Sequence, residues 1–209
     1  MPRTILVTAF DPFGGETLNP AREIAAQLPA EVNGARIITL DMPTAFSSVA
    51  GVLQEGIGKH RPDAIVCLGQ AGGRHAISVE RVAINIADAP IPDNEGTVLA
   101  DAPINPSDPT AYFATLPVKA MVHAIRASGI PAELSHTAGT FVCNYLMYTA
   151  LDILAGTEML AGFIHVPYIP AQAKDPSLPL DDLVRGVTAA LEVLTVDSAA
   201  ATDIRGSLH

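Results

Sequence analysis

Two cysteines, Cys67 and Cys143, are the only thiols in the 209-residue chain, and their surroundings differ. Cys67 lies in DAIVCLG, where a thiol is expected to be a small, inert core side chain. Cys143 lies in TAGTFVCNYLMYTALDIL, where small and polar residues give way to a helix. The unpaired N–H groups of a helix's first turn lower the pKa of a thiol and can bind a developing oxyanion. Local context alone leaves Cys143 as either a nucleophile or a buried helix cysteine.

A thiolate nucleophile needs a base, and His165 stands out among the six histidines. It is the only histidine on a predicted strand, GFIHVPYIP, and it comes near the end of that strand, where α/β sites assemble. By base rates, a lone strand histidine is more often a core residue with its hydrogen bonds satisfied. His75 and His136 lie in predicted loops that could approach a site, whereas His60 ends a helix, where a cation is favourable.

The third candidate is Glu80, in the segment ISVERVAIN. Strand alternation puts Glu80 on the same face as the apolar Val82. A carboxylate on an apolar face requires a partner; Arg81 points the other way, and His165 can be that partner. With Cys143, these residues have the composition of a nucleophile, a base and an orienting carboxylate.

Two glycine-rich segments, FDPFGG and GQAGG, follow the first and third predicted strands. Neither matches the dinucleotide fingerprint G-x-G-x-x-G, and neither is followed by the Gly-Lys-Ser/Thr of a P-loop. A nucleotide- or phosphate-binding module is therefore the minor alternative. We expect these loops to line a crevice at the carboxyl ends of the strands, where α/β proteins bind ligands.

Short apolar runs alternate with helical patterns along the whole chain. The predicted strands are 4–9, 35–40, 63–68, 77–85, 132–135 and 162–166, and the predicted helices are 20–28, 45–60, 118–128, 141–155 and 180–194. This order predicts one α/β domain over residues 1–209, a three-layer sandwich with a mostly parallel, mixed sheet and helices on both faces. The irregular Asp88–Pro109 segment is predicted to be a functional loop or flap, and the tail from Asp197 to fray.

Composition excludes several classes of protein. With 12 basic against 22 acidic residues and a net charge of -10, the chain has no basic stripe for a nucleic-acid partner. An apolar fraction of 49% with 16% charged residues excludes general disorder. Two cysteines cannot form a disulfide framework or a four-cysteine zinc site. Because no apolar run is long enough to span a membrane and none reads as a signal peptide, we expect a cytoplasmic protein.

Six motifs, in order from about Ile5 to Pro170, resemble the pyroglutamyl-peptidase I (pyrrolidone-carboxylate peptidase) family of cysteine peptidases: FDPFGGETLNPA, GQAGGR, ERVAIN, IPDNEG, TAGTFVCN and FIHVPYIP. The resemblance implies that Cys143 is the nucleophile, His165 the general base and Glu80 the residue that orients it. It also implies removal of an amino-terminal pyroglutamyl residue from peptides without metal or cofactor, a twisted mixed sheet between helices, and a homotetramer.

The same resemblance implies a pocket for the pyroglutamyl lactam formed by Phe10, Phe13, Asn19, Thr44, Gln70, Ile91, Phe141 and Val142. Phe10 and Phe13 are expected to sandwich the ring, and Gln70 and Asn19 to provide polar contacts, with Asn19 chiefly fixing Gln70. Alternatives stay open, because the phenylalanines also fit core positions and Asn19 fits a helix cap.

One position departs from the family pattern. Relatives commonly read D-A-R-I-P-D-N, whereas residues 88–94 of this chain read DAPIPDN, so Pro90 replaces an arginine that lies near the active site in the family. The chain lacks that cation and also the backbone N–H at position 90. Either Arg74 or Arg81 compensates, or the protein is a catalytically weak or silent lactam- or peptide-binding protein of the same fold.

Overall fold

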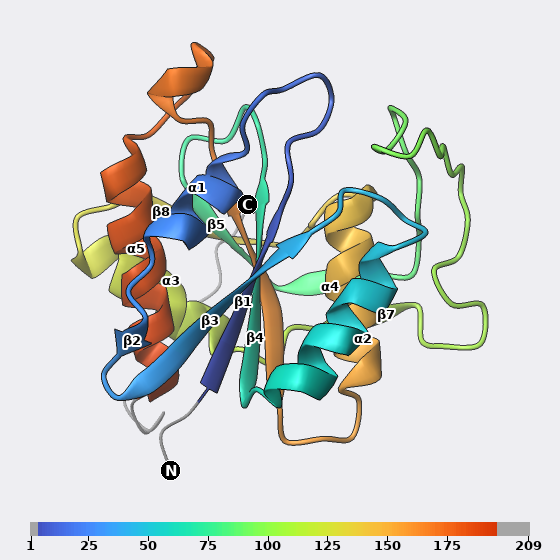
Figure 1. Ribbon diagram of the computed structural model, residues 1–209, viewed down its shortest axis with the longest axis horizontal. Coiled ribbons are helices and arrows are strands. Elements are labelled where there is room, and N and C mark those ends of the chain that lie inside the picture. Colours follow the sequence, from blue (N-terminus) through green and yellow to red (C-terminus); the bar gives the residue numbers. More distant parts are fainter. Residues whose placement is uncertain (1–3, 196–209) are drawn as a thin grey trace.

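A seven-stranded sheet forms the centre of the computed structural model, which describes residues 4–195 (Figure 1). The strand order is β2-β3-β1-β4-β9-β5-β8. These strands are β1 (Thr4–Phe10), β2 (Glu31–Val32), β3 (Ala35–Met42), β4 (Ala64–Gln70), β5 (Ile77–Glu80), β8 (Ala132–Ser135) and β9 (Leu160–Val166). β3, β1, β4 and β9 are parallel, β2 is antiparallel to β3, and β5 is antiparallel to β9 but parallel to β8. The predicted mixed, mostly parallel sheet is confirmed.

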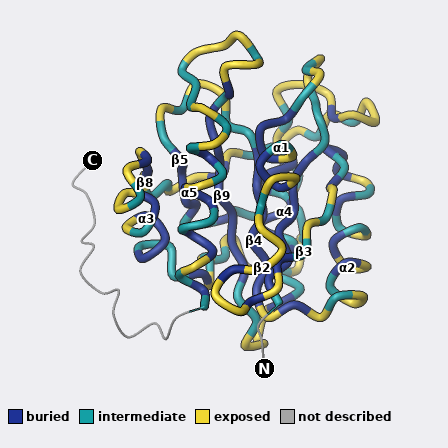
Figure 2. The backbone as a smooth tube through the Cα atoms, turned by 60° about the vertical axis from the view of Figure 1, so that its left-hand side comes forward, coloured by how far each residue is buried: buried dark blue, intermediate teal, exposed yellow. Residues whose placement is uncertain are grey.

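Helices cover both faces of this sheet, as predicted for a three-layer sandwich (Figure 1). One face carries α1 (Pro20–Gln27), α3 (Val118–Ala127) and α5 (Leu180–Glu192), and the other carries α2 (Val49–His60) and α4 (Val142–Ile153). Each face has its own apolar core, and Figure 2 shows the central strands as the most buried part of the chain. The short helices Pro170–Gln172 and Val193–Thr195 complete the described chain.

Side-chain alternation along β9 decides which core receives which residue. Ile164 and Val166 enter the core beneath α1, α3 and α5, whereas Phe163 enters the core beneath α2 and α4. His165 is two residues from Phe163 and therefore points to the α4 side of the sheet. The histidine and the helix that carries Cys143 thus share one face.

The expectation of one continuous strand over 77–85 was wrong. β5 ends at Glu80, and β6 (Val82–Ile84) pairs with β7 (Ala111–Phe113) in a separate two-stranded sheet. The chain changes sheets at Arg81, whose N–H donates to Ser135 of β8 at 2.8 Å while its carbonyl accepts from Ala114 at 2.9 Å. The break leaves Glu80 at the end of its strand.

Hydrogen bonds attach the predicted loop or flap to the segment that leads into α4. Asp88 N–H donates to the Thr140 carbonyl at 2.9 Å, and the Thr140 hydroxyl donates to the Asp88 carbonyl at 2.8 Å. Ala87 and Ala102 pair as an antiparallel bridge, which closes the loop at its base. The start of the 88–109 segment therefore lies against the residues that lead to Cys143.

Asn144, the residue after Cys143, joins α4 to β6. Its wholly buried side chain accepts from Ile84 N–H at 3.0 Å and donates to the carbonyls of Ile84 and Ile86 at 2.9 Å. Because these bonds satisfy buried backbone groups, they fix the start of α4 against the neighbouring strand.

The remaining predicted elements are present with ends shifted by a few residues. The largest shift is in the helix predicted to begin at Ala45, which begins at Val49 because residues 46–48 form a turn. The short strands β2 and β7 were not predicted. The tail from Asp197 lies outside the described residues. Between residues 4 and 195, no helix has the length and apolar character that crossing a membrane requires.

Candidate functional site

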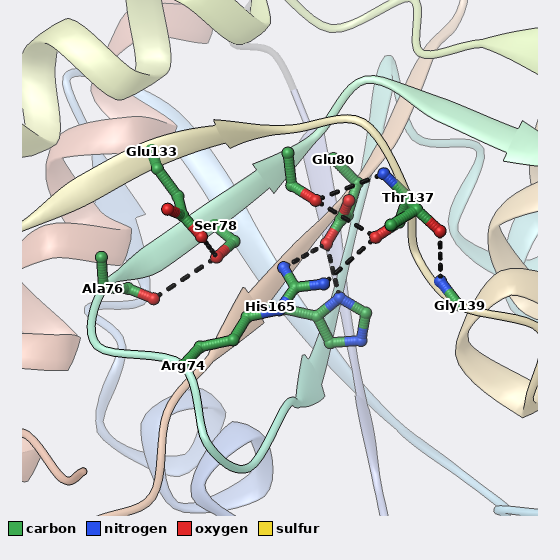
Figure 3. A network of polar contacts seen from close by, with 9 residues as sticks. Arg74, Ala76, Ser78, Glu80, Glu133, Thr137, Gly139 and His165 are labelled. Carbon is green, nitrogen blue, oxygen red and sulfur yellow. Dashed lines mark hydrogen bonds and ion pairs between the residues drawn. The ribbon is translucent and has the colours of Figure 1, made fainter. Parts of the chain in front are cut away.

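Glu80 and His165 form a hydrogen-bonded pair on the α4 face of the sheet. His165 Nδ1 lies 2.8 Å from Glu80 Oε1 (Figure 3). In the antiparallel register of β5 and β9, Ser78 is opposite His165, and Glu80 is two residues further along the same face. The exposed fraction is 0% for Glu80 and 3% for His165. The predicted pairing of these two residues is confirmed.

Burial and the neighbouring charges set the protonation of the pair. Burial by itself raises the pKa of Glu80, but the hydrogen bond and charge of His165, together with the charge of Arg74, bring that pKa below its usual value. Burial lowers the pKa of His165, and Glu80 only partly opposes this. At neutral pH the carboxylate is ionised and the imidazole neutral. Since a carboxylate only accepts hydrogen bonds, Nδ1 carries the proton and Nε2 is free to act as a base.

Cys143 is the second residue of α4, at an uncapped helix start. The N-cap residue is Phe141, and no side chain caps the first turn, so its N–H groups are available to an anion. A Cβ built on Gly69 would lie 3.0 Å from Cys143 Sγ, so the sulfur rests against Gly69. Gly69 of β4 is aligned with His165 of β9. The thiol therefore lies against the residue of β4 that is next to His165 in the sheet.

The helix start lowers the pKa of Cys143, as expected, but burial of the thiol outweighs this effect. Burial raises that pKa to about 12, and the charge of Glu80 adds to the rise. Arg74 and the backbone N–H of Cys143 act in the opposite sense but do not outweigh burial. The thiol is protonated at rest, so it needs a base at the moment of attack rather than a preformed thiolate.

Cys67 has the properties expected of an inert core thiol. Its exposed fraction is 0%, it packs in the apolar core beneath α2 and α4, and burial raises its pKa to about 12. It lies on β4, two residues before Gly69.

The phenylalanines of the expected pocket differ in accessibility. Phe13 and Phe141 are half-buried, with ring centroids 6.0 Å apart. Phe10 is only 1% exposed and packs 6.4 Å from Phe163, centroid to centroid. Phe10 is therefore a core aromatic in this structure, whereas Phe13 and Phe141 present surface to a ligand.

The other pocket positions, Ile91, Thr44 and Val142, also divide into exposed and buried residues. Ile91 is 40% exposed and reaches the loop that carries Phe13, since a Cβ built on Gly14 would lie 3.5 Å from its Cδ1. Thr44 and Val142 are buried, and the Thr44 hydroxyl donates to the Asp11 carbonyl at 3.2 Å. Ile91 and the loop of Phe13 thus keep accessible surface side by side, whereas Thr44 and Val142 are enclosed.

Asn19 does not fix Gln70, contrary to expectation. Asn19 caps α1 by accepting from Ala21 N–H at 3.0 Å, and its amide donates to the Asp11 carbonyl at 3.0 Å. The partner of Gln70 is Gln172, whose Nε2 donates to Gln70 Oε1 at 2.8 Å. The sequence analysis missed Gln172; its only signal was its position just after FIHVPYIP.

Arg74, one of the two arginines considered as compensation for Pro90, pairs with Glu80. Its Nη1 lies 2.6 Å from Glu80 Oε1, and its Nη2 donates to the Thr137 carbonyl at 3.1 Å (Figure 3). Arg81 instead lines a cavity of about 430 Å³ with Phe113 and Lys119, among residues that include none of Cys143, His165 and Glu80. Pro90 is exposed.

The GQAGG loop owes its glycines to packing and backbone conformation. Gly72 lies against the Tyr168 ring without room for a Cβ, and Gly73 has a φ of +86°. These constraints account for the loop without a phosphate. Among the described residues, no group of three or more His, Cys, Asp or Glu side chains is arranged to hold a metal ion.

Comparison with known proteins gives consistent matches over nearly the whole chain. The family model described as pyroglutamyl peptidase matches residues 3–197. The pyrrolidone-carboxylate peptidase of Alkaliphilus oremlandii is 52% identical over 193 residues, covering 90% of this chain and 91% of that protein. The enzyme of the same name from Streptococcus pyogenes serotype M5 is 49% identical over 214 residues, covering 98% and 99%.

Solved structures agree with these sequence matches. The crystal structure of pyroglutamyl peptidase I from Bacillus amyloliquefaciens superposes with a TM-score of 0.90 at 43% identity, covering 99% of this chain and 100% of that one. A mutant pyrrolidone carboxyl peptidase (E192D) from Pyrococcus furiosus gives 0.88 at 41% identity, covering 91% and 97%.

The contact between Gly69 and the thiol gives a direct test of the geometry. Gly69→Ala places a methyl group 2.7 Å from Phe163 Cζ and 3.0 Å from Cys143 Sγ, so the sulfur must move. We expect kcat for a fluorogenic pyroglutamyl amide to fall about 10–100-fold, because small displacements of reacting groups cost that much. Gly58→Ala, where a Cβ meets nothing within 4 Å, should leave kcat unchanged. A wild-type kcat in Gly69→Ala would contradict this placement of Sγ.

Proposed function

Because the chain belongs to the pyroglutamyl peptidase family of cysteine peptidases, we propose that Cys143, His165 and Glu80 carry out its reaction. That reaction is the removal of an amino-terminal pyroglutamyl residue from peptides. The observation that carries the assignment is the 2.8 Å contact between His165 Nδ1 and Glu80 Oε1, with His165 on the strand next to the Gly69 position that supports Cys143 Sγ. The comparisons do not favour a silent lactam-binding protein.

Acylation begins with two neutral groups. As Sγ of Cys143 attacks the pyroglutamyl carbonyl carbon, Nε2 of His165 takes the thiol proton, and the carbonyl π electrons move onto oxygen. N–H groups at the start of α4 stabilise this oxyanion. When the tetrahedral intermediate collapses, the C–N bond breaks, and the imidazolium gives its proton to the leaving amine. The shortened peptide departs and a pyroglutamyl thioester remains.

Deacylation uses the same groups with water. His165 removes a proton from a water molecule that attacks the thioester carbonyl, and the C–S bond breaks as the sulfur recovers a proton. In both steps a transient imidazolium forms beside Glu80. Because Glu80 is held ionised, it stabilises that cation and keeps the proton-bearing Nδ1 directed toward itself.

Gln70 is proposed to bind the lactam through its N–H groups, and a chain of hydrogen bonds supports this polarity. Ile169 N–H can only donate, and it donates to Gln172 Oε1 at 3.1 Å. Nε2 of Gln172 therefore faces Gln70 and donates to its Oε1 at 2.8 Å. Since Oε1 of Gln70 is engaged, its Nε2 remains to donate to an acceptor such as the lactam carbonyl.

The neutral lactam ring fits an apolar slot with few polar groups. Phe13, Phe141 and Ile91, which keep accessible surface, are proposed to contact the ring. Phe10, Asn19, Thr44 and Val142 are buried. We propose that they contribute by supporting these walls and the loop between β1 and α1.

We also propose that the protein acts in the cytoplasm as a homotetramer, as the family resemblance implies. Both cysteines are free thiols, which suits a reducing compartment. Contact between copies is supported by the exposed large apolar side chains of residues 4–195, which lie in the segment 86–113: Ile86, Ile91, Val98 and Phe113.

The two cysteines provide a matched test of the nucleophile. Cys143→Ser should lower the rate of fluorophore release from a pyroglutamyl amide by about 10³-fold or more, because the hydroxyl is a far weaker nucleophile in this site. Cys67→Ala removes the core thiol and should keep a kcat close to that of wild type. Equal rates for Cys143→Ser and wild type would contradict the assignment.

Gln172→Glu tests the proposed polarity of Gln70. A carboxylate at position 172 can only accept, so the Gln70 amide must turn to donate to it and present Oε1 to the lactam. We expect KM to rise about tenfold, equivalent to about 1.4 kcal/mol, with little change in kcat. Gln27→Glu, on the exposed end of α1, makes the same charge change as a control. An unchanged KM in Gln172→Glu would contradict the proposal.

A further inference from the structure

Arg74 joins three parts of the site that are distant in sequence. It lies in the loop between β4 and β5, pairs with Glu80 at the end of β5, and donates to the carbonyl of Thr137 in the segment before α4 (Figure 3). β4 carries Gly69 beneath the thiol, β5 carries the carboxylate, and α4 carries the nucleophile. The Arg74 guanidinium therefore contacts Glu80 directly and also contacts the segment that leads to Cys143.

The contact with Glu80 is made at the oxygen that also binds the histidine. Oε1 of Glu80 is 2.6 Å from Arg74 Nη1 and 2.8 Å from His165 Nδ1. Oε2 is buried and makes no hydrogen bond within the described part of the chain. Ser135 is a further hydrogen-bonding neighbour of the carboxylate, and loss of Arg74 would remove the cation that pairs with it.

Through Thr137, Arg74 contacts a segment that is held by its own hydrogen bonds. The Thr137 carbonyl also accepts from the Ser135 hydroxyl at 3.1 Å, and the Thr137 hydroxyl accepts from Gly139 N–H at 3.1 Å. Four residues beyond Gly139, the chain reaches Cys143. Because the segment is internally bonded, a displacement at Thr137 is transmitted toward the start of α4.

The positive charge of Arg74 lowers the pKa of all three members of the proposed triad. The guanidinium lowers the pKa of Glu80, which keeps the carboxylate ionised, and lowers the pKa of His165, which keeps the imidazole neutral. It also lowers the pKa of the Cys143 thiol, although burial outweighs it there.

We propose that Arg74 is a positioning residue of the reaction, which holds Glu80 and the segment before Cys143 in register. It acts through Glu80 and Thr137. The proposal rests on the proposed function. Arg81, the other arginine considered, donates its backbone N–H to Ser135 but lines a separate cavity.

Three variants test the proposal through kcat, KM and the pH dependence of kcat/KM. Arg74→Gln should lower kcat about 10–100-fold with little change in KM. Arg74→Lys keeps the charge but cannot bridge both partners as the guanidinium fork does, so it should recover part of kcat. Arg81→Gln is the matched control and should behave as wild type.

The pH profile separates positioning from a merely structural role. The groups that act on His165 are Glu80 and Arg74, with the thiol of Cys143 beside it. Removing Arg74 removes a cation that lowers the pKa of His165, so the acid limb of Arg74→Gln should move to higher pH. Glu80→Gln removes an anion that raises this pKa, and its acid limb should move to lower pH. Arg74→Lys should keep the wild-type acid limb.

Two results would overturn the proposal. One is Arg74→Gln with the kcat and acid limb of wild type. The other is a loss of kcat with an unshifted acid limb and a lowered melting temperature, which would make Arg74 a structural residue only. Absence of turnover in wild type would instead contradict the proposed function. The rate of Cys143 alkylation would still test the role of Arg74. At fixed pH, Arg74→Gln should lower this rate, because loss of the cation raises the pKa of the thiol.

Discussion

The buried carboxylate of Glu80 is the constraint on which the site depends. It has no exposed surface and lies on the face of the sheet that packs against α4, where an unpaired charge is unfavourable by several kcal/mol. The antiparallel register of β5 and β9 brings His165 to it, and the loop after β4 brings Arg74. The change of sheets at Arg81 ends β5 at Glu80 and so places the pair at the edge where α4 begins.

Burial then determines the chemistry of the other two groups. It disfavours the charged form of an acid and of a base alike, so the Cys143 thiol stays protonated and the His165 imidazole stays neutral. The helix start does not produce a resting thiolate; it supplies N–H groups for the oxyanion, which forms only during the reaction. The proton therefore moves from sulfur to nitrogen as the substrate is attacked.

Local patterns predicted much of the fold and singled out the three residues of the proposed triad as candidates. Each of the three is a polar or reactive side chain at a position where an inert core residue is expected. They are a carboxylate on an apolar strand face, a histidine near a strand end and a cysteine at a helix start, and such local exceptions mark functional sites. Gln172 was missed, and the choice between Arg74 and Arg81 stayed open, because loop side chains find their partners only in the folded chain. The raised thiol pKa was missed for the same reason, since burial of Cys143 comes from α4 packing on β4 and β9. Nothing in ISVERVAIN signals that the chain changes sheets at Arg81, because its backbone partners, Ser135 and Ala114, come from distant segments.

The central claim is that the resting site holds a neutral thiol beside a neutral imidazole. The most direct measurement is ultraviolet titration of thiolate absorbance in Cys67→Ala, with the spectrum of Cys67→Ala/Cys143→Ser subtracted at each pH. The account predicts no thiolate signal from Cys143 at neutral pH, and its appearance only in strongly alkaline solution, as a thiol pKa of about 12 requires. A thiolate signal that persists through neutral pH and disappears only in acid would show a resting thiolate–imidazolium pair and contradict the account.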